Sequence, residues 1–245
     1  MTLKDSIFLF DVDGTLTPPR QKITEEFEEF FCSFFNKNNA YLASGSDFGK
    51  IKDQLTPRSL NACDGVFTCS GNELWINDEI KYRNDFKISD RMYMLLLVFL
   101  EYTKYPTKTG NHIEERTGMV NFSVVGRNAT LEQRKEYHAW DIQNRERELI
   151  AQTIREHHGE ELTVSIGGEI SIDIYPKGQD KSQAVNYIKT NHPGKRIIFF
   201  GDKTHEGGND YSAVQALGDE DMFYSVKSWE ETYDILKTLE VQQNE

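Results

Sequence analysis

Two carboxylates stand two residues apart near the start of the chain, in the run Asp11-Val12-Asp13-Gly14-Thr15-Leu16-Thr17. They directly follow Ile7–Phe10, a short continuous apolar run that predicts a strand buried on both faces of a parallel sheet. Open α/β sheets bind ligands at the carboxyl ends of such strands. A solvated turn is the ordinary alternative for a bare Asp-x-Asp. Because two carboxylates this close repel each other unless a cation or a proton intervenes, the full run favours a metal site.

The elements that position these carboxylates alternate between strands and helices. After the first strand, the sequence predicts a helix at Thr24–Asn36 capped by Thr24, a strand at Ala40–Ala43, a helix from Asp47 and a strand at Gly65–Cys69. The same pattern resumes with a helix at Lys181 and the strand Arg196–Phe200. This alternation predicts an α/β fold with a doubly wound, Rossmann-like parallel sheet.

The residues between follow another pattern. It predicts a helix at Ser89–Lys104, two strands within Ile113–Val125, a long polar helix from the Thr130/Gln133 capping box to about His158, and a hairpin at Leu162–Tyr175. Such an order predicts an antiparallel sheet backed by helices. We therefore expect a discontinuous core domain of residues 1–82 and 177–245, and an inserted α+β cap domain of residues 83–176.

Composition excludes several classes of protein. The 245 residues include 28 basic and 40 acidic ones, and this net charge of −12 argues against nonspecific nucleic-acid binding. Three cysteines without a Cys-x-x-Cys pair favour reduced thiols over disulfides or zinc. No apolar run approaches the ~20 residues of a membrane span, and no signal peptide is visible. We expect a cytoplasmic protein that binds neither nucleic acid nor membrane.

The run from Asp11 to Thr17 after a first strand resembles the first motif of the haloacid dehalogenase-like phosphotransferases. In that family the first aspartate forms an aspartyl-phosphate and the second is the general acid and base. The other family motifs follow in order, matched by Ser44, by Lys181, and by Gly201-Asp202-Lys203 with Asn209-Asp210. The resemblance implies Asp11 and Asp13 as catalytic residues. As ligands of Mg²⁺ it implies Asp11, Asp13, Asp202 and Asp210.

This set of residues is chemically coherent. A carboxylate that attacks a phosphate dianion meets repulsion between anions, which Mg²⁺ held by Asp11 and Asp202 would offset. Lys181, Ser44 and backbone N–H groups near Asp13 would hold the other phosphoryl oxygens. Asp13 would protonate the leaving oxygen and later take the proton of the acceptor hydroxyl.

Over nearly its whole length the chain resembles the eukaryotic-type phosphomannomutases. The matching stretches are DVDGTLTPPR, SGSDFGKIKDQL, CSGNELW, IEERTGMVNFSVVGR, TLEQR, GGEISIDIYPKGQDKSQ and FFGDKTHEGGNDY. The resemblance implies binding roles for a set of further residues: the cap arginines Arg116, Arg127 and Arg134 on a substrate phosphate, Ser171 and Asp173 on the sugar, and Arg20 from the core.

The alternation of polar and apolar side chains along the predicted strand of residues 170–175 supports these binding roles. It places Ser171, Asp173 and Tyr175 on one face, and Ile170, Ile172 and Ile174 on the other. An ordinary half-exposed sheet and solvated surface arginines are the alternatives to these binding roles.

Two positions depart from the family. It has Gly-Gly-Ser where this chain has Ser44-Gly45-Ser46, so either Ser44 or Ser46 is expected to contact phosphate. It also carries an acidic loop for a second cation, and here Ala216 stands at the expected acidic position. This departure argues against a second cation site, unless the loop is rebuilt around Asp219–Asp221.

The resemblance implies a phosphohexomutase that interconverts mannose 6-phosphate and mannose 1-phosphate. It also implies that the mannose 1-phosphate supplies GDP-mannose synthesis. It implies a hexose 1,6-bisphosphate as activator and intermediate, and a homodimer formed through the cap. A sugar-phosphate phosphatase on the same scaffold is the first alternative, with water in place of the sugar as acceptor. The cap distinguishes the two, because a mutase needs a second phosphate site and a phosphatase need not have one. A binding protein without catalysis is the second, and the intact Asp11, Asp13 and Lys181 argue against it. Mannose and glucose phosphates both remain open as substrates.

Overall fold

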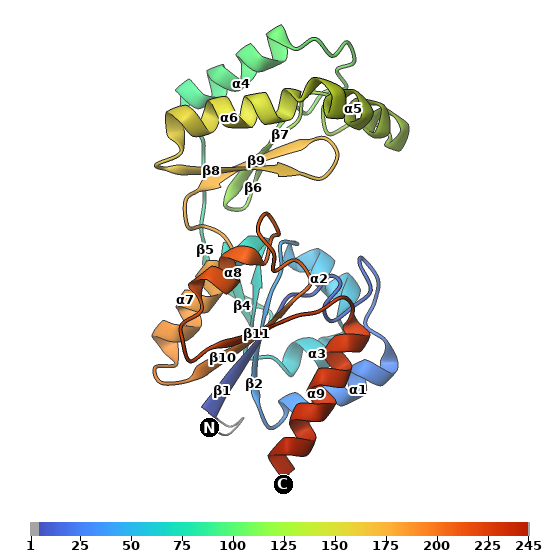
Figure 1. The fold of residues 1–245 in the computed structure, drawn as a ribbon, viewed down its shortest axis with the longest axis vertical. Coiled ribbons are helices and arrows are strands. Elements are labelled where there is room, and N and C mark those ends of the chain that lie inside the picture. The colour runs from blue at the N-terminus through green and yellow to red at the C-terminus, as the bar shows by residue number, and fades with distance from the viewer. Residues whose placement is uncertain (1–4, 245) are drawn as a thin grey trace. The chain divides into compact units, whose positions relative to one another are not determined.

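The structure is a computed structural model that describes residues 5–244, and it divides into two compact units. One unit comprises the chain up to Arg83 and again from Gln179, and we call it the core unit. The other is Asn84–Gly178, which we call the cap unit. Figure 1 shows that the chain enters and leaves the cap unit by two separate connections.

The core unit is built on a seven-stranded sheet in the order β11-β10-β1-β2-β3-β4-β5. The strands from β11 to β3 are parallel, and β4 and β5 add an antiparallel hairpin at one edge. The strands are β1 (Ser6–Phe10), β2 (Asn39–Ala43), β3 (Gly65–Thr68), β4 (Glu73–Ile76), β5 (Glu79–Arg83), β10 (Arg196–Gly201) and β11 (Met222–Ser225). The predicted doubly wound sheet is confirmed, whereas the β4–β5 hairpin and β11 were not expected.

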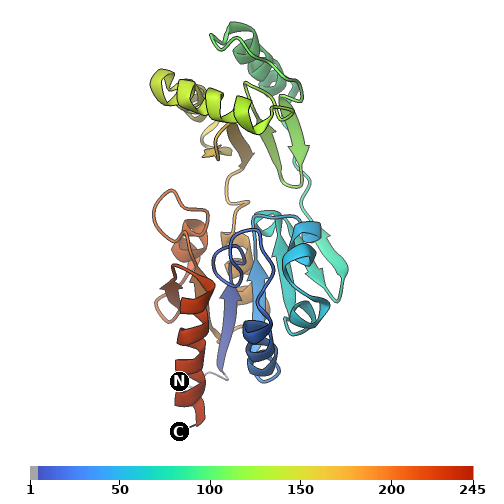
Figure 2. The same cartoon turned by 90° about the vertical axis from the view of Figure 1, so that its right-hand side faces the viewer.

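Helices cover both faces of this sheet (Figures 1 and 2). On one face Phe8, Phe10 and Phe200 pack into a cluster with α1 (Glu25–Phe35), α2 (Phe48–Gln54), α3 (Pro57–Asn61) and α9 (Trp229–Asn244). On the other face Ile7, Leu9 and Phe199 pack against α7 (Ser182–Asn191) and α8 (Tyr211–Ala216). All of β1 is buried, as a continuous apolar run predicts.

The cap unit has a four-stranded antiparallel sheet in the order β6-β7-β9-β8. Its strands are β6 (Ile113–Arg116), β7 (Met119–Phe122), β8 (Leu162–Gly167) and β9 (Ser171–Pro176), and its helices are α4 (Asp90–Tyr102), α5 (Leu131–Asn144) and α6 (Glu146–His158). Ile172 and Ile174 of β9 are buried in a cluster with residues of all three helices, which confirms the predicted face of that strand. The expected antiparallel sheet backed by helices is also confirmed.

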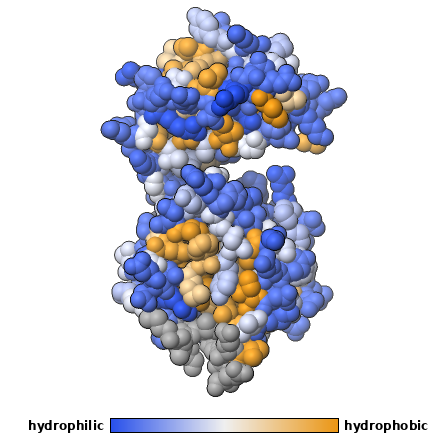
Figure 3. Space-filling view, in the orientation of Figure 1, coloured by the Kyte–Doolittle hydropathy of each residue, from blue (hydrophilic) through white to orange (hydrophobic). Residues whose placement is uncertain are grey.

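One side of α4 remains apolar and exposed. Figure 3 shows hydrophobic surface over this helix at the top of the view. The exposed side chains are those of Tyr93, Met94, Leu97, Val98 and Tyr102. A contiguous apolar helix face of this kind is typical of a protein contact surface. In the part of the chain that the structure describes, no helix is long and apolar enough to cross a membrane.

The long helix expected from Thr130 to about His158 is wrong, because it is two helices that meet at Arg145. This residue has a left-handed φ of 53°, which ends α5 and redirects the chain into α6. Asp141 accepts hydrogen bonds from the N–H of Arg147 at 2.9 Å and from its Nε at 2.7 Å, and both side chains are buried. A buried ion pair therefore fixes the bend, with neither glycine nor proline to mark it in the sequence.

We expect Arg147→Met to destabilise the cap unit by about 3–5 kcal/mol, because it leaves the Asp141 carboxylate buried and unpaired. It also removes the hydrogen bond from Arg147 to the Gly168 carbonyl. Urea unfolding followed by circular dichroism measures the loss. The exposed Lys135→Met on α5 is the matched control, with an expected change within about 0.5 kcal/mol. Equal stability of the two variants would contradict the role of this ion pair.

Candidate active site

Asp11 is the first residue after β1, and its side chain is buried at the carboxyl end of the parallel sheet. Its N–H donates to the Phe200 carbonyl of the neighbouring strand β10 at 2.9 Å, which fixes its position. Lys181 Nζ lies 2.5 Å from Asp11 Oδ1 and 2.5 Å from Asp210 Oδ1. Thr15 donates to the other oxygen of Asp11 at 3.3 Å. The fold thus brings three sequence-predicted residues into one buried ion-paired group.

Burial and charge act in opposite directions on this group. Burial raises the pKa of Asp11 from 3.8 to about 7, since the opposing effect of Lys181 is incomplete and Asp210 and Asp202 add to the rise. Burial alone would lower the pKa of Lys181, but its ion pairs with Asp11 and Asp210 outweigh burial and raise it. Lys181 therefore stays positively charged. Its single charge does not balance the carboxylates of Asp11, Asp210 and Asp202.

Asp202 supplies the third carboxylate, directly after β10. Oxygens of Asp11, Asp202 and Asp210 all lie within 4.8 Å of one another. Within the described residues, Asp202 Oδ1 is buried without a hydrogen-bond partner. Three carboxylates beside the single buried ammonium of Lys181 fit a divalent cation such as Mg²⁺, which prefers carboxylate oxygens. Gly14 allows this approach, because a Cβ there would lie 2.8 Å from Asp202 Oδ2.

Asp210 differs from Asp202 in how its carboxylate is held. It is fully buried, and both of its oxygens have donors within the core unit. Oδ1 accepts from Lys181, and Oδ2 accepts from the N–H of Lys203 at 3.0 Å. These bonds occupy both oxygens of Asp210, whereas Oδ1 of Asp202 has no partner, so Asp210 has less freedom than Asp202 to bind a cation.

Asp13 has partners of its own. Its Oδ1 accepts from the N–H of Arg20 and from Nε2 of Gln54, each at 2.8 Å. Gln54 is the buried last residue of α2 and also donates to Thr17 at 3.2 Å. The two donors hold the carboxylate of Asp13 in one orientation. Gln54 was not predicted as a site residue, because no local pattern links it to a residue 41 positions earlier.

Asp11, Asp13 and Gln54 line a pocket of about 980 Å³ in the core unit, a size suited to a small-molecule ligand. Its polar lining comprises Asp11, Asp13, Arg20, Ser44, Ser46, Lys50, Asp53, Gln54, Lys203 and Asn209. Ser44 Oγ accepts from the N–H of Ser46 at 3.1 Å, so its hydroxyl proton is available to a ligand. Both serines considered from the sequence therefore face the pocket.

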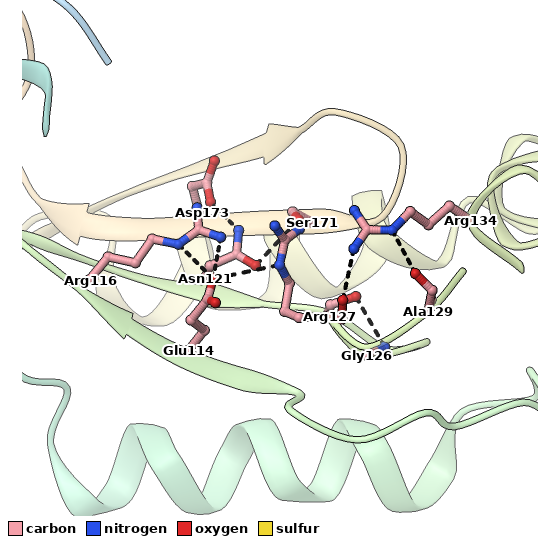
Figure 4. Close-up of polar contacts among 10 residues, drawn as sticks. Glu114, Arg116, Asn121, Gly126, Arg127, Ala129, Arg134, Ser171 and Asp173 are labelled. Carbon is pink, nitrogen blue, oxygen red and sulfur yellow. Dashed lines mark hydrogen bonds and ion pairs between the residues drawn. The ribbon is translucent and has the colours of Figure 1, made fainter. Parts of the chain in front are cut away.

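A second polar cluster lies on the sheet of the cap unit (Figure 4). Arg127 Nη1 donates to Ser171 Oγ at 2.9 Å, and Ser171 donates to Asn121 Oδ1 at 3.3 Å. Asn121 in turn donates to Asp173. Burial raises the pKa of Asp173, partly opposed by Asn121 and the arginines, and burial lowers the pKa of Arg127. The chain of bonds gathers the predicted sugar-binding pair around one arginine.

The other two cap arginines are held differently. Arg116 donates to Glu114 Oε2 from Nε at 2.6 Å, and Arg127 Nε lies 3.5 Å from the same oxygen. Arg134 donates to the carbonyls of Ala129 at 3.0 Å and Arg127 at 2.7 Å. Glu114 and Asn121 were not predicted as site residues. They lie opposite each other in the register of β6 and β7, and a residue pattern along the chain does not give that register.

The acidic loop at Asp219–Asp221 is tied down within the core unit. Asp221 accepts from the N–H groups of Ile197 and Gly218 at 2.8 and 2.7 Å, and it pairs with Lys189 at 3.2 Å. Its carboxylate therefore closes the turn before β11.

The chain is similar in sequence to proteins of one known family. The model of the eukaryotic phosphomannomutase family matches residues 27–242. The phosphomannomutase of Drosophila melanogaster is 38% identical over 215 residues, which cover 84% of both chains. That of Saccharomyces cerevisiae is 34% identical over 243 residues, with 96% of this chain and 94% of the relative covered.

Solved structures share the fold. A haloacid dehalogenase-like hydrolase from Bacteroides thetaiotaomicron has a TM-score of 0.60 at 13% identity, covering 97% of this chain and 99% of that one. Trehalose-6-phosphate phosphatase of Aspergillus fumigatus has a TM-score of 0.60 at 15% identity, covering 98% and 93%. These likenesses speak for the fold, and the sequence matches are more specific: the chain belongs to the eukaryotic phosphomannomutase family.

Proposed function

We propose that this enzyme interconverts mannose 6-phosphate and mannose 1-phosphate through an aspartyl-phosphate on Asp11 and a hexose 1,6-bisphosphate intermediate. The observation that supports the proposal is the presence of two separate clusters of positively charged and hydroxyl side chains, each suited to binding a phosphate. One surrounds Asp11 in the core unit, and the other is the arginine cluster of the cap unit. A mutase needs both, because one phosphate must be held while the other reacts.

The proposed reaction begins with an activating hexose 1,6-bisphosphate. A carboxylate oxygen of Asp11 attacks phosphorus, the bond from phosphorus to the sugar oxygen breaks, and Asp13 gives its proton to that oxygen. In the reverse direction Asp13 takes the proton of a hydroxyl on the sugar monophosphate, and that oxygen attacks the phosphoryl group. The bond to Asp11 then breaks and its carboxylate is restored. The bonds from Gln54 and the Arg20 N–H aim Asp13 for both transfers.

Other residues of the core unit would hold the phosphoryl group. Lys181 offers a fixed positive charge, and Ser44 and Ser46 offer hydroxyls from the end of β2. Asp11 and Asp202, with Asp210 and the backbone at Asp13 nearby, would hold Mg²⁺. When bound, this ion would neutralise charge between the nucleophile and the phosphoryl oxygens. Asp210 would stay bound to Lys181 whether Asp11 is free or phosphorylated, and it would thereby act as a positioning residue.

We further propose a homodimer formed through the cap unit. The exposed apolar face of α4 supports this, because Tyr93, Met94 and Val98 would be buried by a second copy. We also propose a cytoplasmic enzyme that supplies mannose 1-phosphate for GDP-mannose synthesis. The thiol state of Cys32, Cys63 and Cys69 is in keeping with that compartment.

The metal proposal predicts that Asp202→Asn weakens Mg²⁺ binding by at least about tenfold, because the variant loses an anionic ligand. Isothermal titration of the substrate-free protein with Mg²⁺ measures it without reference to activity. Asp219→Asn makes the same change of charge on an exposed loop and should bind Mg²⁺ like the wild type. Unchanged affinity in Asp202→Asn would remove Asp202 from the metal site.

The mutase proposal predicts that Arg127→Ala reduces transfer to hexose monophosphate by about tenfold or more, since a charged hydrogen bond contributes about 1.5–3 kcal/mol. More of the phosphoenzyme should then be lost to water. The measurement is the ratio of mannose 6-phosphate to free phosphate formed from mannose 1-phosphate with Mg²⁺ and glucose 1,6-bisphosphate, repeated with glucose 1-phosphate. Lys135→Ala is the control cation in the same unit. A wild type that yields mainly free phosphate, with a ratio that Arg127→Ala leaves alone, would favour a sugar-phosphate phosphatase instead.

A further inference from the structure

Glu114 stands in a row of polar residues that crosses the whole cap sheet. It is paired with Asn121 on β7, Asn121 with Asp173 on β9, and Asp173 with Ser165 on β8. The adjacent row, formed by Ile113, Phe122, Ile172 and Ile166, points the other way, and its central members are buried beneath the helices. The carboxylate of Glu114 therefore lies on the polar face of the sheet, among the groups that would meet a sugar phosphate.

One oxygen of Glu114 receives two guanidinium groups. Arg116 follows it by two residues on β6, so the two side chains share a face, and Arg116 donates to Oε2 through both Nε and Nη2. Arg127 Nε approaches the same oxygen at 3.5 Å. Guanidinium groups bind a phosphate oxygen by the same charge-assisted hydrogen bonds that these arginines direct at Glu114.

The other charged groups of the cluster do not share this arrangement. Asp173 is bonded to Asn121 rather than paired directly with an arginine. Arg134 is held by two backbone carbonyls, which leave its charge uncompensated. Glu114 is thus the carboxylate that neutralises cap arginines, and it is partly exposed, which leaves it room to turn away.

We propose that Glu114 is an internal competitor for phosphate: it pairs with Arg116 and Arg127 while the cap is empty and is displaced when a phosphate binds. This inference rests on the proposed function, which makes the cap arginines a phosphate site. In a mutase each phosphate of the bisphosphate must leave these arginines once per cycle. A carboxylate that returns to them lowers the cost of that departure, at the expense of affinity.

The test is the isosteric Glu114→Gln in the full chain, titrated calorimetrically with inorganic phosphate at fixed ionic strength. We expect phosphate to bind about three- to tenfold more tightly, because the competing charge is gone. In turnover, KM for hexose monophosphate should fall and kcat should fall with it. Glu115→Gln is the matched control, since this exposed neighbour on β6 points to the opposite face and carries the same charge. Glu114→Ala should shift affinity in the same direction as Glu114→Gln.

A variant that lacks both arginines tests whether the effect of Glu114→Gln on phosphate affinity acts through them. In Arg116→Ala/Arg127→Ala, adding Glu114→Gln should change phosphate affinity by less than about twofold, since nothing remains to compete for. Weaker or unchanged binding in Glu114→Gln alone would overturn the inference and make Glu114 a support for the arginines or a bystander. If the double arginine variant binds phosphate with wild-type affinity and stoichiometry, the cap holds no phosphate. The proposed function then fails as well, and the two failures are told apart.

Discussion

The structure depends on holding three carboxylates close together at one edge of a sheet. Asp11, Asp202 and Asp210 come from three separate segments, and their charges repel one another in a buried setting. Only rigid supports can enforce such an arrangement. β1 and β10 provide them, because their apolar residues pack against helices on both faces of the sheet. The free energy of that burial offsets the electrostatic cost of the site at its end.

Lys181 makes the arrangement tolerable, and its placement explains why one lysine serves two carboxylates. A buried ammonium needs an anionic partner at every stage, since an unpaired buried charge is costly. In the proposed acyl-phosphate state the Asp11 carboxylate would lose its negative charge, but Asp210 would keep its own. The bond from the Lys203 N–H further fixes Asp210. In the proposed reaction the lysine would then turn toward the phosphoryl group and keep Asp210 as its counter-ion.

Features that depend on a local residue pattern could be predicted from the sequence, whereas features that depend on tertiary contacts could not. Buried parallel strands such as Ile7–Phe10 were found, because both faces demand apolar residues. β5 and β11 are largely exposed and carry no such run. The bend at Arg145 depends on a buried ion pair, a tertiary feature. The motif residues of the site were found by resemblance, but Gln54 and Glu114 act through packing and strand register, which residue spacing along the chain does not contain.

The two clusters share one electrical design with opposite signs. In the core unit three carboxylates lie around one buried cation, Lys181. In the cap unit the guanidinium groups of Arg116 and Arg127 lie around one oxygen of Glu114. Lys181 holds the carboxylates around it in place before any ligand arrives, and Glu114 does the same for Arg116 and Arg127. Less reorganisation is therefore needed on binding. Lys181 and Glu114 differ in exposure and therefore in role. Lys181 is buried and stays in place, whereas Glu114 is partly exposed and can exchange with an anion from solution.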